Sequence, residues 1–106
     1  MAWFLLFVAG LLETAWAYSM KQSQGFTRLW PTVITLVTVV ASFGLLATAM
    51  KSLPLGTAYM IWTGIGAVGA FLVEIAWMGG QATAMRIVAA LMIVGGLLIM
   101  KLTSAA

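Results

Sequence analysis

One carboxylate in this sequence stands where a membrane protein can use it for binding chemistry. Glu13 is the only charged residue between Met1 and Lys21, in an otherwise apolar stretch. A charged side chain at the middle of a bilayer costs roughly 2.5–3.5 kcal/mol on insertion scales. A residue that is so expensive to bury is a candidate for function, and the other polar residues are therefore considered in relation to Glu13.

Residues on the same helical face as Glu13 are the first candidates for a site around it. Trp16 follows Glu13 by three positions, and Gly10 precedes it by three, so a helix would place all three on one face. Tyr59 and Trp62 have the same spacing and would share a face of a later helix. We expect these residues to support the site.

Ser42 and the aromatic residues also have plainer explanations. Trp and Tyr are frequent at membrane surfaces, but Trp16 and Trp62 lie well inside their apolar stretches. A single serine within a helix often hydrogen-bonds to the backbone of its own helix, and we favour that interpretation for Ser42 taken alone. Taken together, the acid, the hydroxyl, the phenol and the two indoles predict a binding pocket.

Such a pocket suits a small organic cation. A carboxylate supplies charge and accepts two parallel N–H hydrogen bonds from a guanidinium group. Aromatic faces add cation–π attraction. Burial disfavours the ionised carboxyl group, so Glu13 can hold either a proton or a cation but not both. That mutual exclusion is the minimal chemistry of a proton–cation antiporter.

The composition excludes several classes of protein. Of the 106 residues, 64% are hydrophobic and 7% are charged, against about 25% charged in a soluble domain, which makes lipid the expected solvent. The absence of cysteine and histidine excludes disulfides, thiolate metal sites and His-dependent catalytic centres. Glu13 and Glu74 alone are too few for a metal cage, so we expect no enzyme, metal or cofactor. The five basic residues are scattered singly at the ends of apolar runs, which argues against nucleic-acid binding.

Four apolar stretches predict four transmembrane helices in a single domain, with no extramembrane domain. Their ranges are about 2–20, 29–50, 55–78 and 82–102, within a domain of residues 1–106. A signal peptide is the alternative for the first stretch, but three further apolar stretches follow it. The very short Lys51-Ser52 connection predicts that the second and third helices are antiparallel neighbours. The fourth stretch can span a bilayer only if residues 82–85 join the helix and its cationic ends snorkel outward.

Glycines in the last two helices suggest close contacts or bending. Gly64, Gly66 and Gly69 predict either close packing between helices or a point where the helix kinks, and the two interpretations are compatible. Gly95 and Gly96 predict a contact with another copy of the chain.

The positive charges give the chain almost no preferred orientation. Lys21, Arg28 and Arg86 fall on one side of the membrane, and Lys51 and Lys101 fall on the other. Either another feature sets the orientation of the chain in the membrane, or the chain has no single orientation. In the second case the chain inserts both ways and pairs with an inverted copy of itself. Such a pair supplies in trans the inverted repeat that many transporters contain.

Along essentially its whole length, the chain resembles the small multidrug resistance family, and within it the guanidinium exporters. The resemblance rests on motifs that are specific in their order and spacing. The matching segments are Gly10-Leu11-Leu12-Glu13, Trp16-Ala17, Lys21, Gly25-Phe26-Thr27-Arg28-Leu29, Ser42, Lys51-Ser52-Leu53-Pro54-Leu55-Gly56-Thr57-Ala58-Tyr59, Ile61-Trp62-Thr63-Gly64-Ile65-Gly66-Ala67-Val68-Gly69-Ala70 and Met85-Arg86. Trp16, Lys51, the Thr63–Ala67 segment and Lys101 favour the guanidinium subtype. Exporters of quaternary ammonium ions tend to have a small residue where Trp16 stands.

The resemblance implies a complete transport mechanism. It implies an antiparallel dimer in the plasma (inner) membrane of a bacterium, in which both Glu13 carboxylates bind either substrate or protons. Ser42, Tyr59 and Trp62 would hold Glu13 by hydrogen bonds, and Trp16 would line the site. The implied activity is export of guanidinium or substituted guanidinium ions against import of two protons per cycle, with the halves exchanging conformations. Whether the partner is an identical chain or a paralogue is left open.

Glu74 departs from the family pattern. The family usually has a glycine–glutamate pair in the third connection, where this chain has Gly79-Gly80-Gln81. We favour a Glu74 that snorkels to the membrane surface and pairs with Arg86. The alternatives are an additional ionisable group near the pathway and a contact that specifies a non-identical partner. A broad exporter of hydrophobic cations and a passive channel or structural subunit remain the other functional hypotheses. A channel would need a continuous polar stripe, whereas here the polar groups cluster at one depth.

Overall fold

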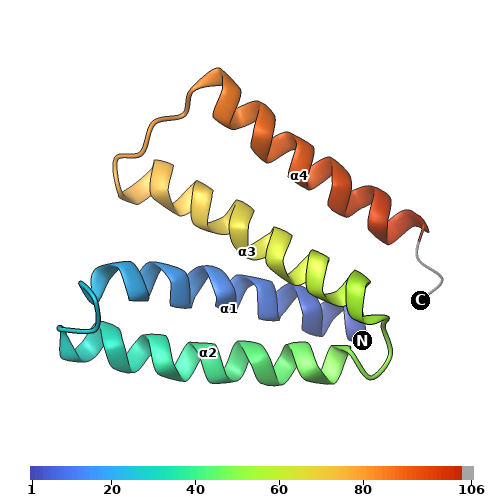
Figure 1. Ribbon diagram of the computed structural model, residues 1–106, viewed down its shortest axis with the longest axis horizontal. Coiled ribbons are helices and arrows are strands. Elements are labelled where there is room, and N and C mark those ends of the chain that lie inside the picture. The colour runs from blue at the N-terminus through green and yellow to red at the C-terminus, as the bar shows by residue number, and fades with distance from the viewer. Residues whose placement is uncertain (104–106) are drawn as a thin grey trace.

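Four helices follow one another in the computed structural model, which describes residues 1–103 (Figure 1). They are α1 (Ala2–Gln22), α2 (Leu29–Ala49), α3 (Leu55–Trp77) and α4 (Ala84–Thr103). All four are long and apolar enough to cross a membrane, since 20 residues of helix span about 30 Å. The predicted all-α membrane fold is confirmed. The last three residues of the predicted domain, 104–106, lie outside the described part of the chain.

Local sequence explains where the helices begin and end. Pro31 lies in the first turn of α2, where its missing N–H costs no helical hydrogen bond. Before it, Gln24, Gly25 and Phe26 all have positive φ angles, and the Ser23 hydroxyl accepts a hydrogen bond of 3.0 Å from the Phe26 N–H. This turn reverses the chain between α1 and α2.

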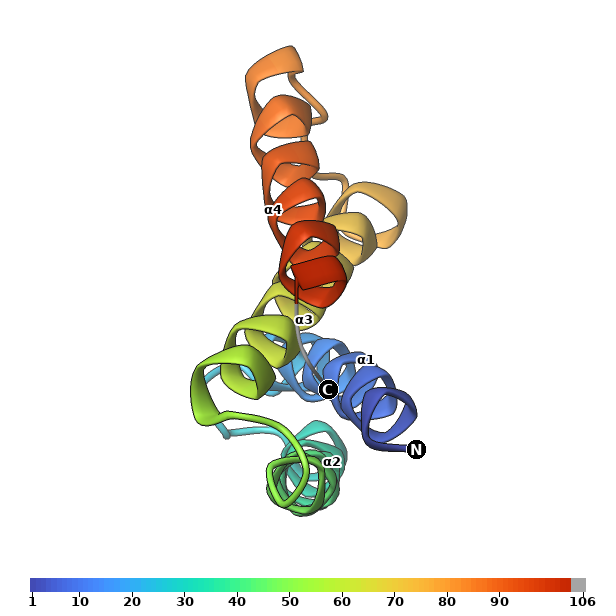
Figure 2. The same cartoon turned by 90° about the vertical axis from the view of Figure 1, so that its right-hand side faces the viewer.

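α1 is the central helix of the fold. Its backbone runs closely along α2 and also along α3, whereas α2 and α3 approach each other over only a short stretch. Figure 2 shows α3 crossing over α1 while α2 lies beneath. α2 and α3 are antiparallel, as their short connection predicts, but they are held together mainly through α1. The residues of α1 therefore meet both neighbours.

α4 stands at the edge of the fold. Its backbone approaches only α3, and none of its residues is buried. It begins at Ala84, slightly later than the predicted start near residue 82. Lys101 near its end lies with its amino group 4.7 Å from the centre of the Trp3 ring of α1, a cation–π contact. Most of α4 is left uncovered by the rest of the chain.

Candidate functional site

Glu13 lies where α1 packs most closely on α3. The side chain lies against Gly66, and a Cβ atom at that position would overlap the carboxyl group. The Glu13 Oε1 atom is buried and has no hydrogen-bond partner within residues 1–103. A buried carboxylate oxygen without a donor is costly. This oxygen therefore lacks, within residues 1–103, the donor that would offset its burial.

The glycines of α3 are what allow α1 to come so close. Gly69 lies against the Thr14 side chain, and a Cβ at Gly69 would collide with its hydroxyl. Thr14 donates a hydrogen bond of 3.3 Å to the Gly66 carbonyl. On the α1 side, a Cβ at Gly10 would come within 2.6 Å of Ile65 Cγ2. The structure therefore supports close packing at these glycines.

The other predicted glycines differ in their surroundings. Gly64 lies against Leu97 of α4, where a Cβ would approach Leu97 Cδ2 to 2.6 Å. α3 is one continuous helix from Leu55 to Trp77, so bending at Gly64, Gly66 and Gly69 stays a prediction. Gly95 and Gly96 have open space around them, and their role in a dimer also stays a prediction.

Ser42 connects three helices through two hydrogen bonds. Its hydroxyl donates to the Ala9 carbonyl of α1 at 2.7 Å and accepts from the Trp62 indole N–H of α3 at 2.9 Å. Ser42 is fully buried, and Trp62 is 6% exposed. The interpretation that Ser42 bonds to its own helix is wrong, because both of its hydrogen bonds are to groups of neighbouring helices.

An aromatic cluster surrounds this connection. The ring of Trp62 has edge-on contacts with Tyr59 at 5.7 Å and with Phe43 at 5.5 Å. Tyr59 is 53% exposed and Phe43 is 51% exposed, so the cluster reaches the surface of the chain. Tyr59 and Trp62 do share a face of α3, as their spacing predicts.

Trp16 packs against the buried core, but its polar atom is unpaired. The Trp16 indole N–H is buried and has no acceptor within residues 1–103. It follows Glu13 by one turn of α1, so an unpaired donor and an unpaired acceptor lie near each other on one helix.

The structure brings the predicted site residues together only in part. Ser42, Tyr59 and Trp62 form one connected cluster, and Glu13 with Gly10 forms a second one against α3. The hydrogen bonds that the resemblance implies from Ser42, Tyr59 or Trp62 to Glu13 are not formed within the described chain, because Ser42 and Trp62 satisfy each other. Thr14 and Phe43 were not predicted from the sequence; each stands next to a predicted residue, and that adjacency is the only signal for them.

Residues 1–103 contain two acidic side chains, Glu13 and Glu74. They contain no group of three or more acidic side chains that could hold a metal ion. Away from Glu13, the Arg86 guanidinium pairs with Glu74 at 3.2 Å. This confirms the pairing favoured from the sequence.

Four helices able to cross a membrane, one of which carries a partly buried carboxylate at its contact with α3, define a small multi-pass membrane protein. The family model described as "Small Multidrug Resistance protein" matches residues 1–94. A protein of Yersinia pseudotuberculosis named "Guanidinium exporter" is 53% identical over 98% of this chain and all of its own length. Proteins of the same name from Escherichia coli K12 and Proteus vulgaris are 50% and 51% identical, over 98% of this chain and 99% and 100% of theirs. The chain belongs to the small multidrug resistance family and is a membrane transport protein.

Proposed function

We propose that this protein exports guanidinium and small guanidinyl cations from a bacterial cell in exchange for protons. The observation that carries the proposal is the buried, unpaired oxygen of Glu13. A guanidinium ion would supply the missing donors through two parallel N–H hydrogen bonds. The printed name of the relatives, at about half identity over nearly the whole chain, supports the choice of cation.

Proton coupling follows from the same carboxyl group. A proton on Glu13 satisfies the oxygen that would otherwise bind the cation, so the two ligands compete for one site. The cation and the proton would bind the same carboxyl oxygens, which favours exchange over simultaneous binding. Each export of a cation would therefore be coupled to the movement of protons in the opposite direction.

An antiparallel dimer would complete the pathway. α4 has no buried residue, and Gly95 and Gly96 on it would accept a close helix from a second copy. The even distribution of positive charge supports insertion in both orientations. In such a dimer two Glu13 carboxylates would share one site and be exposed to each side of the membrane in turn, with bending of α3 at its glycines.

The test is transport by the purified protein in proteoliposomes. A guanidinium gradient should drive proton movement, followed with a pH dye inside the vesicles. Glu13→Gln keeps the side-chain size but loses the ionisable group and should abolish the coupled movement. Proton movement by wild type with a quaternary ammonium ion and not with guanidinium would contradict the choice of substrate. Coupled transport that persists in Glu13→Gln would contradict the assigned role of Glu13.

A further inference from the structure

The guanidinium group of the Arg86 side chain is bound near the last turn of α3, away from Glu13. The Arg86 Nη2 atom donates to Oε1 and Oε2 of Glu74 at 3.2 Å and 3.3 Å. Its Nη1 atom donates to the Gln81 carbonyl at 2.8 Å. The central carbon of the guanidinium lies 5.0 Å from the centre of the Phe71 ring. A carboxylate, a carbonyl and an aromatic face thus hold the Arg86 head group.

The same three groups are suited to a free guanidinium ion. Carboxylates and aromatic faces bind any planar guanidinium in the same way. The Arg86 and Glu74 side chains are 40% and 44% exposed, so the pair is accessible at the surface of the chain. Exposed ion pairs are weak, on the order of 0–1 kcal/mol. Arg86 can therefore be displaced by a competitor with the same head group.

The connection between α3 and α4 is shaped around the Glu74 carboxylate. The Glu74 side chain lies over Gly80, where a Cβ atom would come within 2.7 Å of Oε2. The Gly80 N–H also donates to the Glu74 carbonyl at 3.0 Å. The space beside this carboxylate exists because residue 80 has no side chain.

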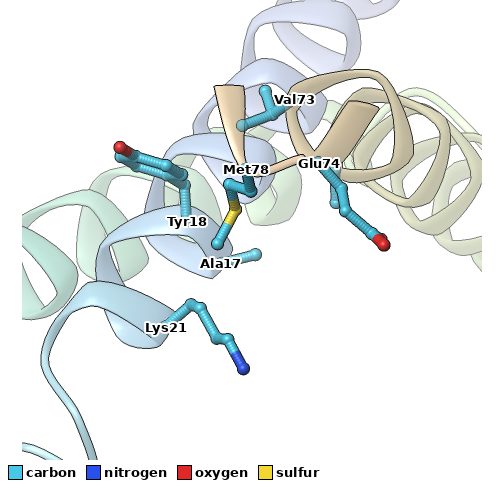
Figure 3. Close-up of a pocket in the computed structure, with 7 residues that line it drawn as sticks. Ala17, Tyr18, Lys21, Val73, Glu74 and Met78 are labelled. Atoms are coloured by element: carbon cyan, nitrogen blue, oxygen red, sulfur yellow. The ribbon is translucent and has the colours of Figure 1, made fainter. Parts of the chain in front are cut away.

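A cavity of about 420 Å³ lies between α1 and α3 and has Glu74 on its wall. Figure 3 shows Lys21 from α1 and Glu74 from α3 extending in the same direction at this cavity. Ala17 of α1 and Ala70 of α3 also line it. Ala17 is about one turn from Glu13, and Ala70 is about one turn from Gly66, which contacts Glu13. This cavity therefore lies beside Glu74 on the side of α1, whereas Phe71 and Arg86 line a separate cavity between α3 and α4.

Charge makes Glu74 the one attractive group for a cation at this end. Glu13 and Glu74 are the only acidic residues in the sequence. Lys21 on the cavity wall and Arg86 on Glu74 both repel a cation. A guanidinium ion that replaces Arg86 on Glu74 keeps the carboxylate paired.

We propose that Glu74 and the Phe71 ring form a second, peripheral guanidinium-binding site, which Arg86 fills until a free guanidinium ion displaces it. From this site the ion would pass along Glu74, which also lines the cavity beside α1, toward Glu13. The role as an entry site rests on the proposed function, whereas the binding of guanidinium at Glu74 does not. The tethered Arg86 competes at an effective concentration in the millimolar range, so its removal should strengthen binding severalfold.

The experiment measures guanidinium chloride binding to the purified full-length protein by isothermal titration calorimetry. All variants carry Glu13→Gln, which removes the main site, and sodium chloride replaces guanidinium chloride in a parallel titration. Glu13→Gln alone should bind guanidinium weakly. Adding Arg86→Ala should tighten binding severalfold, to a dissociation constant on the order of 1 mM. Adding Glu74→Gln to that pair should abolish binding.

A matched control is available at another loop. Arg28 donates to the Gln22 carbonyl at 3.5 Å and is exposed, so Arg28→Ala should leave guanidinium binding unchanged. If Arg86→Ala elutes as an aggregate, Arg86→Gln replaces it, since glutamine can still donate to the Gln81 carbonyl. Equal binding with and without Glu74, or binding that Arg86 removal does not strengthen, would overturn the proposal.

The outcomes also separate this proposal from the proposed function. Coupled transport by wild type together with no Glu74-dependent binding would refute the peripheral site alone. Glu74-dependent binding together with no guanidinium transport by wild type would refute the export function and leave the peripheral binding site standing.

Discussion

The Trp62 indole donates to the Ser42 hydroxyl at 2.9 Å, and Ser42 in turn donates to the Ala9 carbonyl. One hydroxyl thereby ties α3 and α2 to the backbone of α1, one turn from Glu13. In a bilayer no water replaces a lost hydrogen-bond partner, so each group in this series of hydrogen bonds depends on the others. The relationship fixes the depth of Trp62 relative to the helix that carries the carboxylate.

Replacing Ser42 by alanine should destabilise the protein and impair transport. The change leaves the Trp62 donor without a partner in a buried position, at a cost of about 1–3 kcal/mol. Thermal unfolding in detergent measures the loss. Thr48→Ala is the matched control, because the Thr48 hydroxyl donates to Gly44 within its own exposed turn. A loss of stability in Thr48→Ala as large as that in Ser42→Ala would argue against a special role for the three-helix connection.

Gly66→Ala should abolish or strongly reduce coupled transport. The added Cβ would overlap the Glu13 carboxyl group, which must then leave its position between α1 and α3. Gly44→Ala is the control, since a Cβ there meets nothing within 4 Å. Proteoliposome transport by both variants, with equal reconstitution, makes the comparison. Normal activity in Gly66→Ala would show that Glu13 does not work from the position seen against α3.

Trp16→Gly should broaden the range of transported cations. The indole ring packs against the core, and its removal opens space one turn from Glu13. Quaternary ammonium ions, which offer no N–H donor and need more room, should then be exchanged for protons while guanidinium transport weakens. Competition between the two cations in proteoliposomes measures the change. A Trp16→Gly variant that still excludes quaternary ammonium ions would locate the size limit elsewhere.

Guanidinium binding should weaken as the pH falls. A proton and the cation compete for Glu13, so acid pH raises the guanidinium concentration needed for half-maximal binding. The rise should approach about tenfold per pH unit for each proton displaced. Titrations of the purified protein over a range of pH measure it. Binding of guanidinium that is independent of pH would contradict competition at one carboxyl group.

Several features could be predicted from residue order alone. Long apolar runs with charges at their ends require helices in lipid, because a helix satisfies its backbone groups internally. The isolated charge of Glu13 can be seen within one apolar stretch, and the three-residue spacing of Tyr59 and Trp62 within another. Neither feature depends on how the helices pack. The Glu74–Arg86 pair joins two residues across one short connection, so few partners were available to either side chain.

The sequence by itself determined that this chain is four membrane helices and that Glu13 is the one acid within its first apolar stretch; it favoured the Glu74–Arg86 pair without excluding the alternatives. Only the tertiary structure decided that α1 is the central helix, that Ser42 bonds to Ala9 and Trp62, and that Gly66 and Gly69 receive Glu13 and Thr14. The physical reason is that helical periodicity fixes which residues share a face but not which helix that face meets. Those partners follow from how closely two backbones approach, and the glycines of α3 set that distance.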